Sequence, residues 1–148
     1  MIIILNISII ITTFLLMEVV AWSTHKYVMH GILWSWHKSH HTLHTNKLEK
    51  NDLFAVVFSI PSILLVIIGH ELEYYPWIKF IGYGILSYGI FYFLFHDILV
   101  HRRIKTPFKA RNGYLKRLIH AHYIHHKKHT KHSCEAFGFL FAPKKYKK

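Results

Sequence analysis

The sequence predicts an all-α integral membrane protein with about three transmembrane helices and a cytoplasmic, histidine-rich helical cap. Three observations lead to this prediction: long apolar runs separated by polar segments, a formal net charge of +12 with the basic residues beside those runs, and 15 histidines in 148 residues. A helix needs roughly 20 mostly apolar residues to cross a bilayer. A chain of this length is expected to form a single domain, here residues 1–148.

Three apolar runs are the candidates for membrane-spanning helices. The first, residues 2–22, is preferred as a span over a cleaved signal peptide, because no Lys or Arg precedes it and it is longer than the apolar part of such a peptide. The others are residues 53–69, in which we expect Pro61 to introduce a kink, and residues 78–95. Part of 108–142 could form a further, half-buried helix.

The charges predict the orientation of these helices. The segment after the third run is rich in Lys and Arg, whereas the loop at 70–77 has none. Because cytoplasmic loops are enriched in Lys and Arg, the segments after the first and third runs are predicted to be cytoplasmic. Glu18, near the inner end of the first run, is expected to be an interfacial acid that reaches water, or else a functional carboxylate. The apolar runs argue against nucleic acid as the partner of this basic chain.

Ten histidines form four motifs in the order HxxxxH, HxxHH, HxxxxH, HxxHH. They are His25 and His30, then His37, His40 and His41, then His96 and His101, then His122, His125 and His126. Positions i, i+3 and i+4 share a helix face, so each triplet is expected to point at one centre. The members of each HxxxxH pair lie about 140° apart on an ideal helix. Either a helix end or π-bulge brings them together, or they serve two metals from opposite sides.

These motifs predict a metal site. Imidazole suits zinc, copper, iron and nickel, and ten histidines in paired motifs exceed the four ligands of one structural zinc, which indicates two metals. The lone Cys134 excludes an internal disulfide and a cysteine-based cluster. Asp97, inside a motif, could hydrogen-bond a ligand imidazole or could be a plain surface acid. The other five histidines are not expected to be ligands: His44, His70, His120, His129 and His132.

The four motifs in this order resemble the fatty acid hydroxylase/sterol desaturase superfamily. The segments HKYVMHG, WHKSHH, NDLFAVVF, HDILVH, GYLKRLIHAHYIHH and FGFLFAP further resemble the bacterial β-carotene 3-hydroxylases, from about residue 18 to residue 143. The resemblance implies a non-haem di-iron monooxygenase with two iron ions, O₂ as co-substrate and electrons from reduced ferredoxin. It implies hydroxylation of β-ionone rings at C3 and C3′, giving β-cryptoxanthin and zeaxanthin. It also implies that the ten motif histidines are the metal ligands, with no further catalytic residue.

The implied partners are a carotenoid, ferredoxin and the lipid bilayer, with the metal site at the cytoplasmic side of the inner membrane. Six phenylalanines could line the path of the ring or could face lipid: Phe91, Phe93, Phe95, Phe137, Phe139 and Phe141. The basic tail could dock an acidic ferredoxin or could simply follow from the topology. Two alternatives remain: a related hydroxylase or desaturase acting on a fatty acyl chain, a sterol or another lipid, and a non-enzymatic haem- or metal-binding membrane protein.

Overall fold

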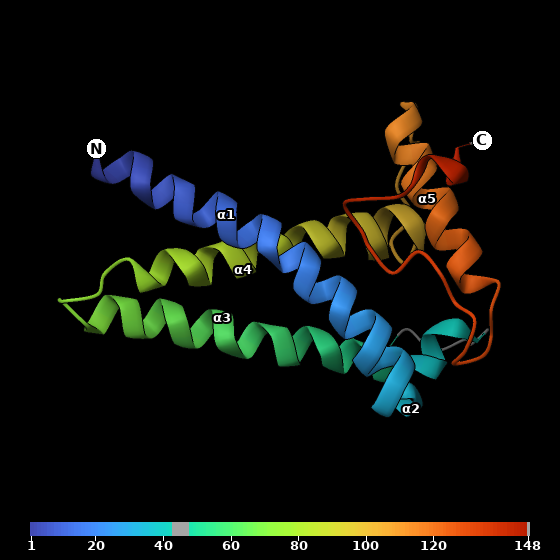
Figure 1. The fold of residues 1–148 in the computed structure, drawn as a ribbon, viewed down its shortest axis with the longest axis horizontal. Helices are drawn as coiled ribbons and strands as arrows, with labels where there is room; N and C mark the ends of the chain where they lie inside the picture. Colours follow the sequence, from blue (N-terminus) through green and yellow to red (C-terminus); the bar gives the residue numbers. More distant parts are fainter. Residues whose placement is uncertain (43–47, 148) are drawn as a thin grey trace.

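The computed structural model describes residues 1–42 and 48–147 and is helical, with no strand in those ranges. In chain order the elements are α1 Ile2–Ser23, η1 Thr24–Ile32, α2 Trp34–His37, η2 Lys38–His41, η3 Lys50–Asp52, α3 Leu53–Glu71, α4 Ile78–Tyr92, η4 Phe93–Val100, α5 Gly113–His126 and η5 Lys144–Tyr146 (Figure 1). The predicted all-α class is confirmed.

Within the described ranges, three helical stretches are long and apolar enough to cross a membrane. They are Ile2–Ile32, Lys50–Glu71 and Ile78–Val100. The first and third extend beyond the predicted runs, because the π-helical segments η1 and η4 follow α1 and α4 directly, and η1 has a kink at Gly31. Pro61 lies inside α3, and the helix continues on both sides of it.

Helix α5 is the additional helix that we considered for residues 108–142. It has 14 residues, which gives a length of about 21 Å, against about 30 Å for the hydrocarbon core of a bilayer. It begins at a helix cap, where the side chain of Asn112 accepts a hydrogen bond from the backbone N–H of Leu115 at 2.7 Å. It lies at the end of the molecule that also holds α2 (Figure 1). This helix belongs to the cap and not to the membrane-spanning part.

Small residues on α4 allow the spanning helices to pack closely. A Cβ atom added to Gly82 would lie 2.8 Å from the carbonyl oxygen of Ser62 on α3, and one added to Gly84 would lie 2.5 Å from Cβ of Thr13 on α1. The Ser62 hydroxyl also donates to the Gly82 carbonyl at 2.8 Å. In Figure 1, α3 and α4 form a hairpin that α1 crosses. Such small-residue contacts are typical of helices packed in lipid.

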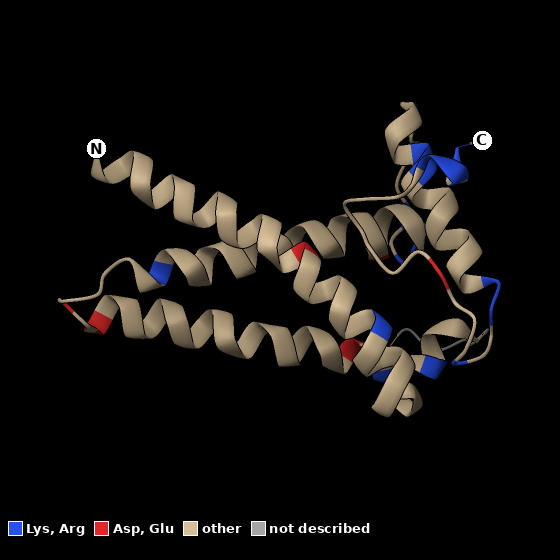
Figure 2. Ribbon diagram, viewed as in Figure 1, with Lys and Arg blue, Asp and Glu red and all other residues tan. Residues whose placement is uncertain are grey.

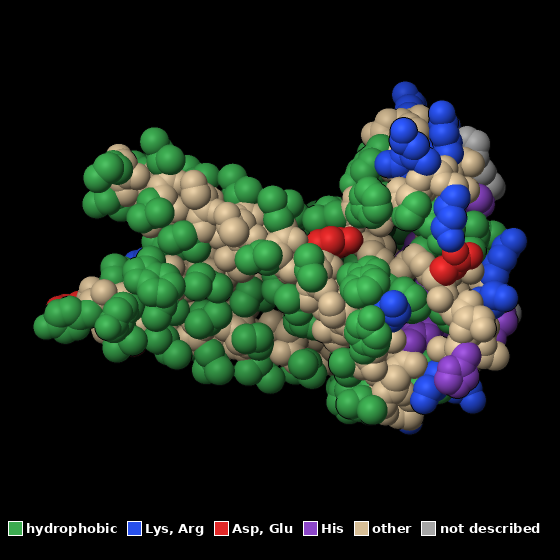
Figure 3. Space-filling view, viewed as in Figure 1, with side chains coloured by type: hydrophobic (Ala, Val, Ile, Leu, Met, Phe, Trp, Pro, Cys, Tyr) green, Lys and Arg blue, Asp and Glu red, His purple; other side chains and the backbone are tan. Residues whose placement is uncertain are grey.

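The two ends of the molecule differ in chemistry. Apolar side chains cover the long helices, whereas Lys, Arg and His gather at the end formed by α2, α5 and the C-terminus (Figures 2 and 3). An apolar surface of this extent is unfavourable in water and fits a bilayer. The main buried cluster lies under the cap, where Phe95, Leu118, Ala121, Phe139, Ala142 and Tyr146 pack together. This cluster fixes α5 and the C-terminal segment on the end of α4 and η4.

We predict that Gly84→Val destabilises the protein, because its Cβ would overlap Thr13 and force α1 away from α4. Overpacking of this kind costs about 1–3 kcal/mol. Gly89→Ala is the matched control, since no atom lies within 4 Å of a Cβ added there. Thermal unfolding in detergent, followed by circular dichroism, should give a lower Tm for Gly84→Val alone. Equal Tm values for the two variants would contradict this packing.

Candidate metal centre

The structure brings all ten motif histidines together at the cap. Within residues 1–42 and 48–147, the side chains suited to hold a metal ion form two groups of five. The His25 group contains His25, His30, His37, His41 and His125, and the His96 group contains His40, His96, His101, His122 and His126. In each group, one nitrogen per residue lies within 4.8 Å of all the others. His101 and His126 are half-buried, and the other eight are buried.

The HxxxxH pairs converge because the chain changes its helical repeat there. His25 and His30 lie in η1, and His96 lies in η4 with His101 directly after it. The backbone N–H of His101 donates to the His96 carbonyl at 2.9 Å, which is the i to i−5 bond of a π-turn. The wider turn brings positions i and i+5 onto one side of the helix. Each pair therefore serves one group, and the alternative of two metals on opposite sides is wrong.

The HxxHH triplets, by contrast, do not point at one centre, and that prediction is wrong. His37 and His41 belong to the His25 group, while His40 belongs to the His96 group. The second triplet mirrors this division, with His122 and His126 in the His96 group and His125 in the His25 group. In the α-helix α5, at about 100° per residue, His122 and His126 differ by only about 40°, whereas His125 and His126 differ by about 100°. Helix α5 therefore sends its i, i+4 pair to one group and its i+3 residue to the other. The first triplet lies at the end of α2 and in the 3-10 segment η2, and it is divided in the same way.

Each imidazole of the His25 group is held by its outer nitrogen. The Nδ1 atoms of His25, His30, His41 and His125 pair with the backbone carbonyls of Phe137, Lys131, Lys128 and Glu135 at 2.9, 3.3, 2.8 and 2.8 Å, and Nδ1 of His37 pairs with Oδ1 of Asn51 at 2.7 Å. A carbonyl oxygen can only accept a hydrogen bond, so the proton of each neutral ring lies on Nδ1. The inward Nε2 atoms then carry lone pairs, which is the form that binds metal.

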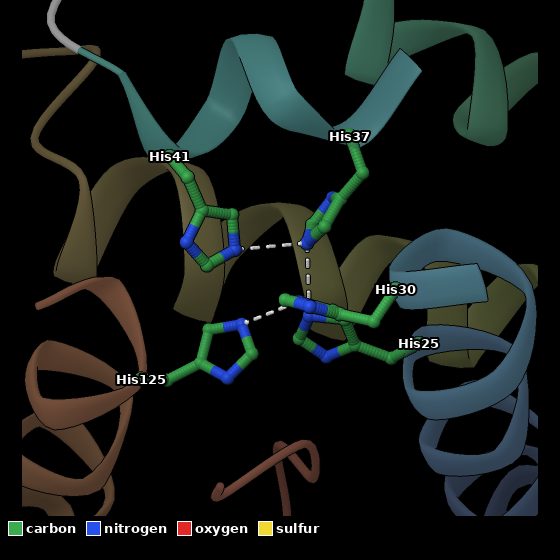
Figure 4. Close-up of side chains that lie close together, drawn as sticks. All are labelled: His25, His30, His37, His41 and His125. Atoms are coloured by element: carbon green, nitrogen blue, oxygen red, sulfur yellow. Dashed lines mark hydrogen bonds between the residues drawn. The ribbon is translucent and has the colours of Figure 1, made fainter. Parts of the chain in front are cut away.

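The inward nitrogens approach each other too closely for neutral rings without a cation between them. Nε2 of His30 lies 3.2 Å from Nε2 of His125, although both rings have already placed their proton on the outer nitrogen. His37 makes equally short contacts to His25 and His41, both 3.1 Å, drawn as dashed lines in Figure 4. Two imidazoles bound at a right angle to one metal at about 2.1 Å would have their nitrogens about 3.0 Å apart. The spacing fits a shared metal ion.

Burial keeps these rings neutral. Removal from water lowers the pKa of His37 to about 3, of His41 and His101 to about 4, and of His125 to about 2. The charged form is disfavoured because a buried cation loses its hydration. Near neutral pH these side chains therefore offer unprotonated nitrogens, as metal ligation requires.

Two rings of the His96 group are held by carboxylates. Nδ1 of His40 donates to Glu49 at 3.0 Å, and Nδ1 of His96 donates to Asp97 at 3.0 Å, while the two Nε2 atoms lie 3.0 Å apart. Asp97 thus takes the first of the two roles considered for it, a hydrogen bond to a candidate ligand. The side chain of Arg103 connects these two carboxylates, because it contacts Glu49 at 2.6 Å and Asp97 at 3.7 Å. A metal in the His96 group would therefore have a more negative surrounding than one in the His25 group.

A buried nitrogen of the His96 group also favours a metal. Nδ1 of His122 and Nε2 of His126 have no hydrogen-bond partner within the described residues. A buried polar atom without a partner costs about 1–3 kcal/mol, and coordination through Nε2 of His126 would remove that cost for this ring. The two groups are neighbours, since the rings of His41 and His126 stack with centroids 4.5 Å apart. The arrangement suits two adjacent metal ions.

The remaining histidines of the described chain lie outside both groups. His70 contacts the Tyr83 hydroxyl at 3.1 Å, and His120 donates to the Tyr146 carbonyl at 2.9 Å. His129 and His132 are exposed, and His129 contacts the carbonyl of His41. His44 lies outside the described residues.

Sequence reasoning missed the outer partners Asn51, Asp52, Glu49 and Arg103. The signal that could have found two of them is the spacing of Glu49 and Asp52 directly before the second apolar run, because these residues form a capping box at the start of that helix. Asp52 also contacts Arg103 at 2.8 Å. The start of this helix therefore supplies two of the acidic side chains around the His96 group.

An apolar cavity of about 450 Å³ extends from the middle of the spanning helices to the metal centre. Residues of α1, α3 and α4 line it, among them Met17, Phe58, Ser62, Leu86 and Gly89, and its cap end includes His25, Asn51, Tyr92, Asp97 and Phe139. The cavity offers a membrane-dissolved molecule a route to the histidines.

The six candidate phenylalanines take different places. Phe93 and Phe139 line this cavity, whereas Phe91 and Phe95 line a smaller one of about 320 Å³. Phe137 packs against the rings of His25, His30 and His125, and Phe141 is exposed. Two of the six are thus placed along the main route to the centre.

Comparison with known proteins agrees with this geometry. The family model described as fatty acid hydroxylase matches residues 10–143. The chain belongs to the fatty acid hydroxylase family. Its relatives include the β-carotene hydroxylase of Pantoea ananas, 47% identical over 93% of this chain and 78% of the relative, and that of Paracoccus sp. (strain PC1), 43% identical over 91% and 83%.

A more distant relative is the chloroplastic β-carotene 3-hydroxylase of Haematococcus lacustris, 37% identical over 86% of this chain and 40% of the relative. No solved structure matches the chain. Membership of this family, together with the two histidine groups, supports a metal site in a membrane oxidoreductase.

We predict that His125→Ala and His96→Ala each reduce the bound metal from about two ions to about one or none, because each removes a ligand from a different group. His70→Ala is the matched control, since His70 lies at the far end of α3 and outside both groups. Metal per protein is measured by mass spectrometry after reconstitution with ferrous iron and desalting. Full metal content in all three variants would contradict the site.

Proposed function

We propose that this protein is a β-carotene 3-hydroxylase, which adds hydroxyl groups to the β-ionone rings at C3 and C3′ and forms zeaxanthin through β-cryptoxanthin. The observation that carries the proposal is the apolar cavity that leads from the spanning helices to two groups of buried histidines. It suits a substrate that is dissolved in the bilayer and is oxidised at one end. The relatives support the identity of that substrate, since four bacterial β-carotene hydroxylases are 42–47% identical over at least 91% of this chain.

In this proposal each histidine group holds one iron ion, with the ten motif histidines as ligands. When bound, non-haem iron supplies the one-electron and O₂ chemistry that amino-acid side chains lack. The protein's own part is to fix imidazoles through their outer nitrogens, as Phe137, Glu135 and Asp97 do. The rings of Tyr92 and Phe139, packed 4.9 Å apart at the end of the cavity, exclude water from the substrate ring.

We further propose that the cap faces the cytoplasm and receives electrons from reduced ferredoxin. The support is the distribution of charge, because Lys and Arg gather at the cap (Figure 2), and positively charged segments of membrane proteins remain on the cytoplasmic side. The same basic surface suits an acidic protein that docks transiently. The histidine groups lie at this end, so the electrons would not have to cross the bilayer. We also propose that residues 1–148 form one functional domain.

The direct test is expression of the chain in a bacterial host that accumulates β-carotene, followed by pigment chromatography. We expect new peaks that match β-cryptoxanthin and then zeaxanthin. Neither peak should form with an empty vector or with His125→Ala, while His70→Ala should behave as the wild type. Unchanged β-carotene, with iron-loaded protein present in the membrane, would reject this substrate and favour a fatty acyl chain, a sterol or another lipid.

The cavity gives a second prediction. Gly89 lines it, and no atom lies within 4 Å of a Cβ added at this position, so the side chain of Gly89→Leu would occupy the cavity. We expect an increase of about tenfold in the KM for β-carotene, which corresponds to about 1.4 kcal/mol of lost binding free energy. Gly113→Leu is the control, because that glycine also has open space beside it but does not line the cavity. Equal KM values in assays with detergent-solubilised carotene would count against the cavity as the substrate site.

A further inference from the structure

Glu18 is a carboxylate in the middle of a membrane-spanning helix, and its contacts are with protein groups. Of the two roles predicted for it, they favour a functional carboxylate over an interfacial acid that reaches water. Acidic residues at such positions are costly and are usually functional. The side chain is half-buried, and both of its oxygens accept hydrogen bonds. Oε2 accepts from the hydroxyl of Tyr88 on α4 at 2.7 Å. Oε1 accepts from the backbone N–H groups of Phe139 and Leu140 at 2.8 and 2.9 Å.

These bonds fasten the C-terminal segment to the spanning helices. The segment around Phe139 has no regular secondary structure, so its N–H groups need partners from elsewhere. Gly138 lets the backbone come close enough, because a Cβ atom added there would lie 2.7 Å from Oε1 of Glu18. The carboxylate on α1, the hydroxyl on α4 and the two amides of the tail thus form one latch.

The latch holds a side chain that touches both histidine groups. The ring of Phe139 is 4% exposed and lies parallel to that of His25, with 5.6 Å between centroids. It also lies 5.6 Å from the ring of His96 and 5.9 Å from that of His122, both members of the His96 group. Since Phe139, Tyr88 and His25 all line the cavity, the Phe139 ring lies at its cap end, beside the metal centre.

We propose that Glu18 and Tyr88 are positioning residues that fix Phe139 as the end wall of the cavity, and that this wall determines which carbon of the substrate ring is hydroxylated. The proposal rests on the proposed function. Neighbouring ring carbons are only about 1.5 Å apart, the length of a carbon–carbon bond. A displacement of about 1 Å in an active site changes rates by about a hundredfold. A wall that moves by this distance would therefore change the choice between C3 and its neighbours C2 and C4.

The test compares the products of Glu18→Leu, Glu18→Gln and Phe139→Leu in the β-carotene-producing host. Leucine removes the acceptors, whereas glutamine keeps one carbonyl oxygen that can accept from the two amides. We expect Glu18→Leu and Phe139→Leu to raise the ratio of C2 and C4 products to C3 products by about tenfold, and Glu18→Gln to restore the wild-type ratio. Glu73→Leu, which removes an exposed acid in the loop between α3 and α4, is the matched control.

A purely structural role would lower the Tm of the Glu18 variants and leave the product ratio unchanged, and that result would overturn the proposal. Where Glu18→Leu does not accumulate, Phe139→Leu decides, because this variant keeps the backbone amides that Glu18 binds. Products at C3 alone from folded, iron-loaded Phe139→Leu would overturn the role of the wall.

A second readout does not depend on the substrate. Glu18→Leu should speed hydrogen exchange at the amides of Phe139 and Leu140 and leave exchange in α5 unchanged. Unchanged exchange at these two amides would overturn the latch, even where the wild type hydroxylates β-carotene. Conversely, a wild type that leaves β-carotene unchanged while exchange responds as expected would reject the proposed function and retain the latch.

Discussion

The structure depends on one electrostatic constraint: buried imidazole nitrogens face each other with their protons on the outer side. His30 and His125 show it most simply, because both outer nitrogens pair with backbone carbonyls while the inner ones lie 3.2 Å apart. Neutral rings in this arrangement repel each other, and charged rings would be costly at this depth of burial. A metal ion resolves both difficulties at once. With a metal ion in each group, ten histidines can lie close together at one end of a small chain without this repulsion.

The rest of the fold positions those imidazole rings. The first and third spanning helices each end in a π-helical turn that brings two histidines onto one side. The two HxxHH segments lie between the centres and contribute to both. Each group therefore receives one HxxxxH pair, one i, i+4 pair and the i+3 histidine of the other triplet. The membrane-spanning parts of the helices present apolar side chains to lipid and pack against each other through small residues such as Gly84.

The sequence was sufficient to predict the three spans and to pick out the ten histidines that the structure brings together. Apolar length and repeated motifs are local properties of a chain. It could not decide whether His25 and His30 converge, since that depends on a π-turn that competes closely with the α-helical one. The division of His37, His40 and His41 between two centres was also hidden, because it depends on what packs on each side of the segment. Long-range partners such as Glu18 with Phe139, or Arg103 with Glu49, have no local signal.

The two histidine groups lie at the end of the membrane-spanning part of the molecule, and this location suits the proposed function. In the proposed function, a substrate that dissolves in lipid would approach along the apolar cavity, whereas electrons and protons would arrive from the polar end, where Lys and Arg gather (Figure 3). The histidine groups lie where these two routes meet. The carboxylates around the His96 group, absent from the described contacts of the His25 group, indicate that the two metals would not be electronically equal.

The central claim is that two adjacent cages made of imidazole hold two metal ions. The most direct measurement is X-ray absorption at the iron edge of the purified, iron-loaded protein. The account predicts a first shell dominated by nitrogen, about five imidazoles per iron, with scattering from a second iron nearby. A shell dominated by carboxylate oxygen, or iron bound by one or two imidazoles without a neighbouring metal, would contradict it.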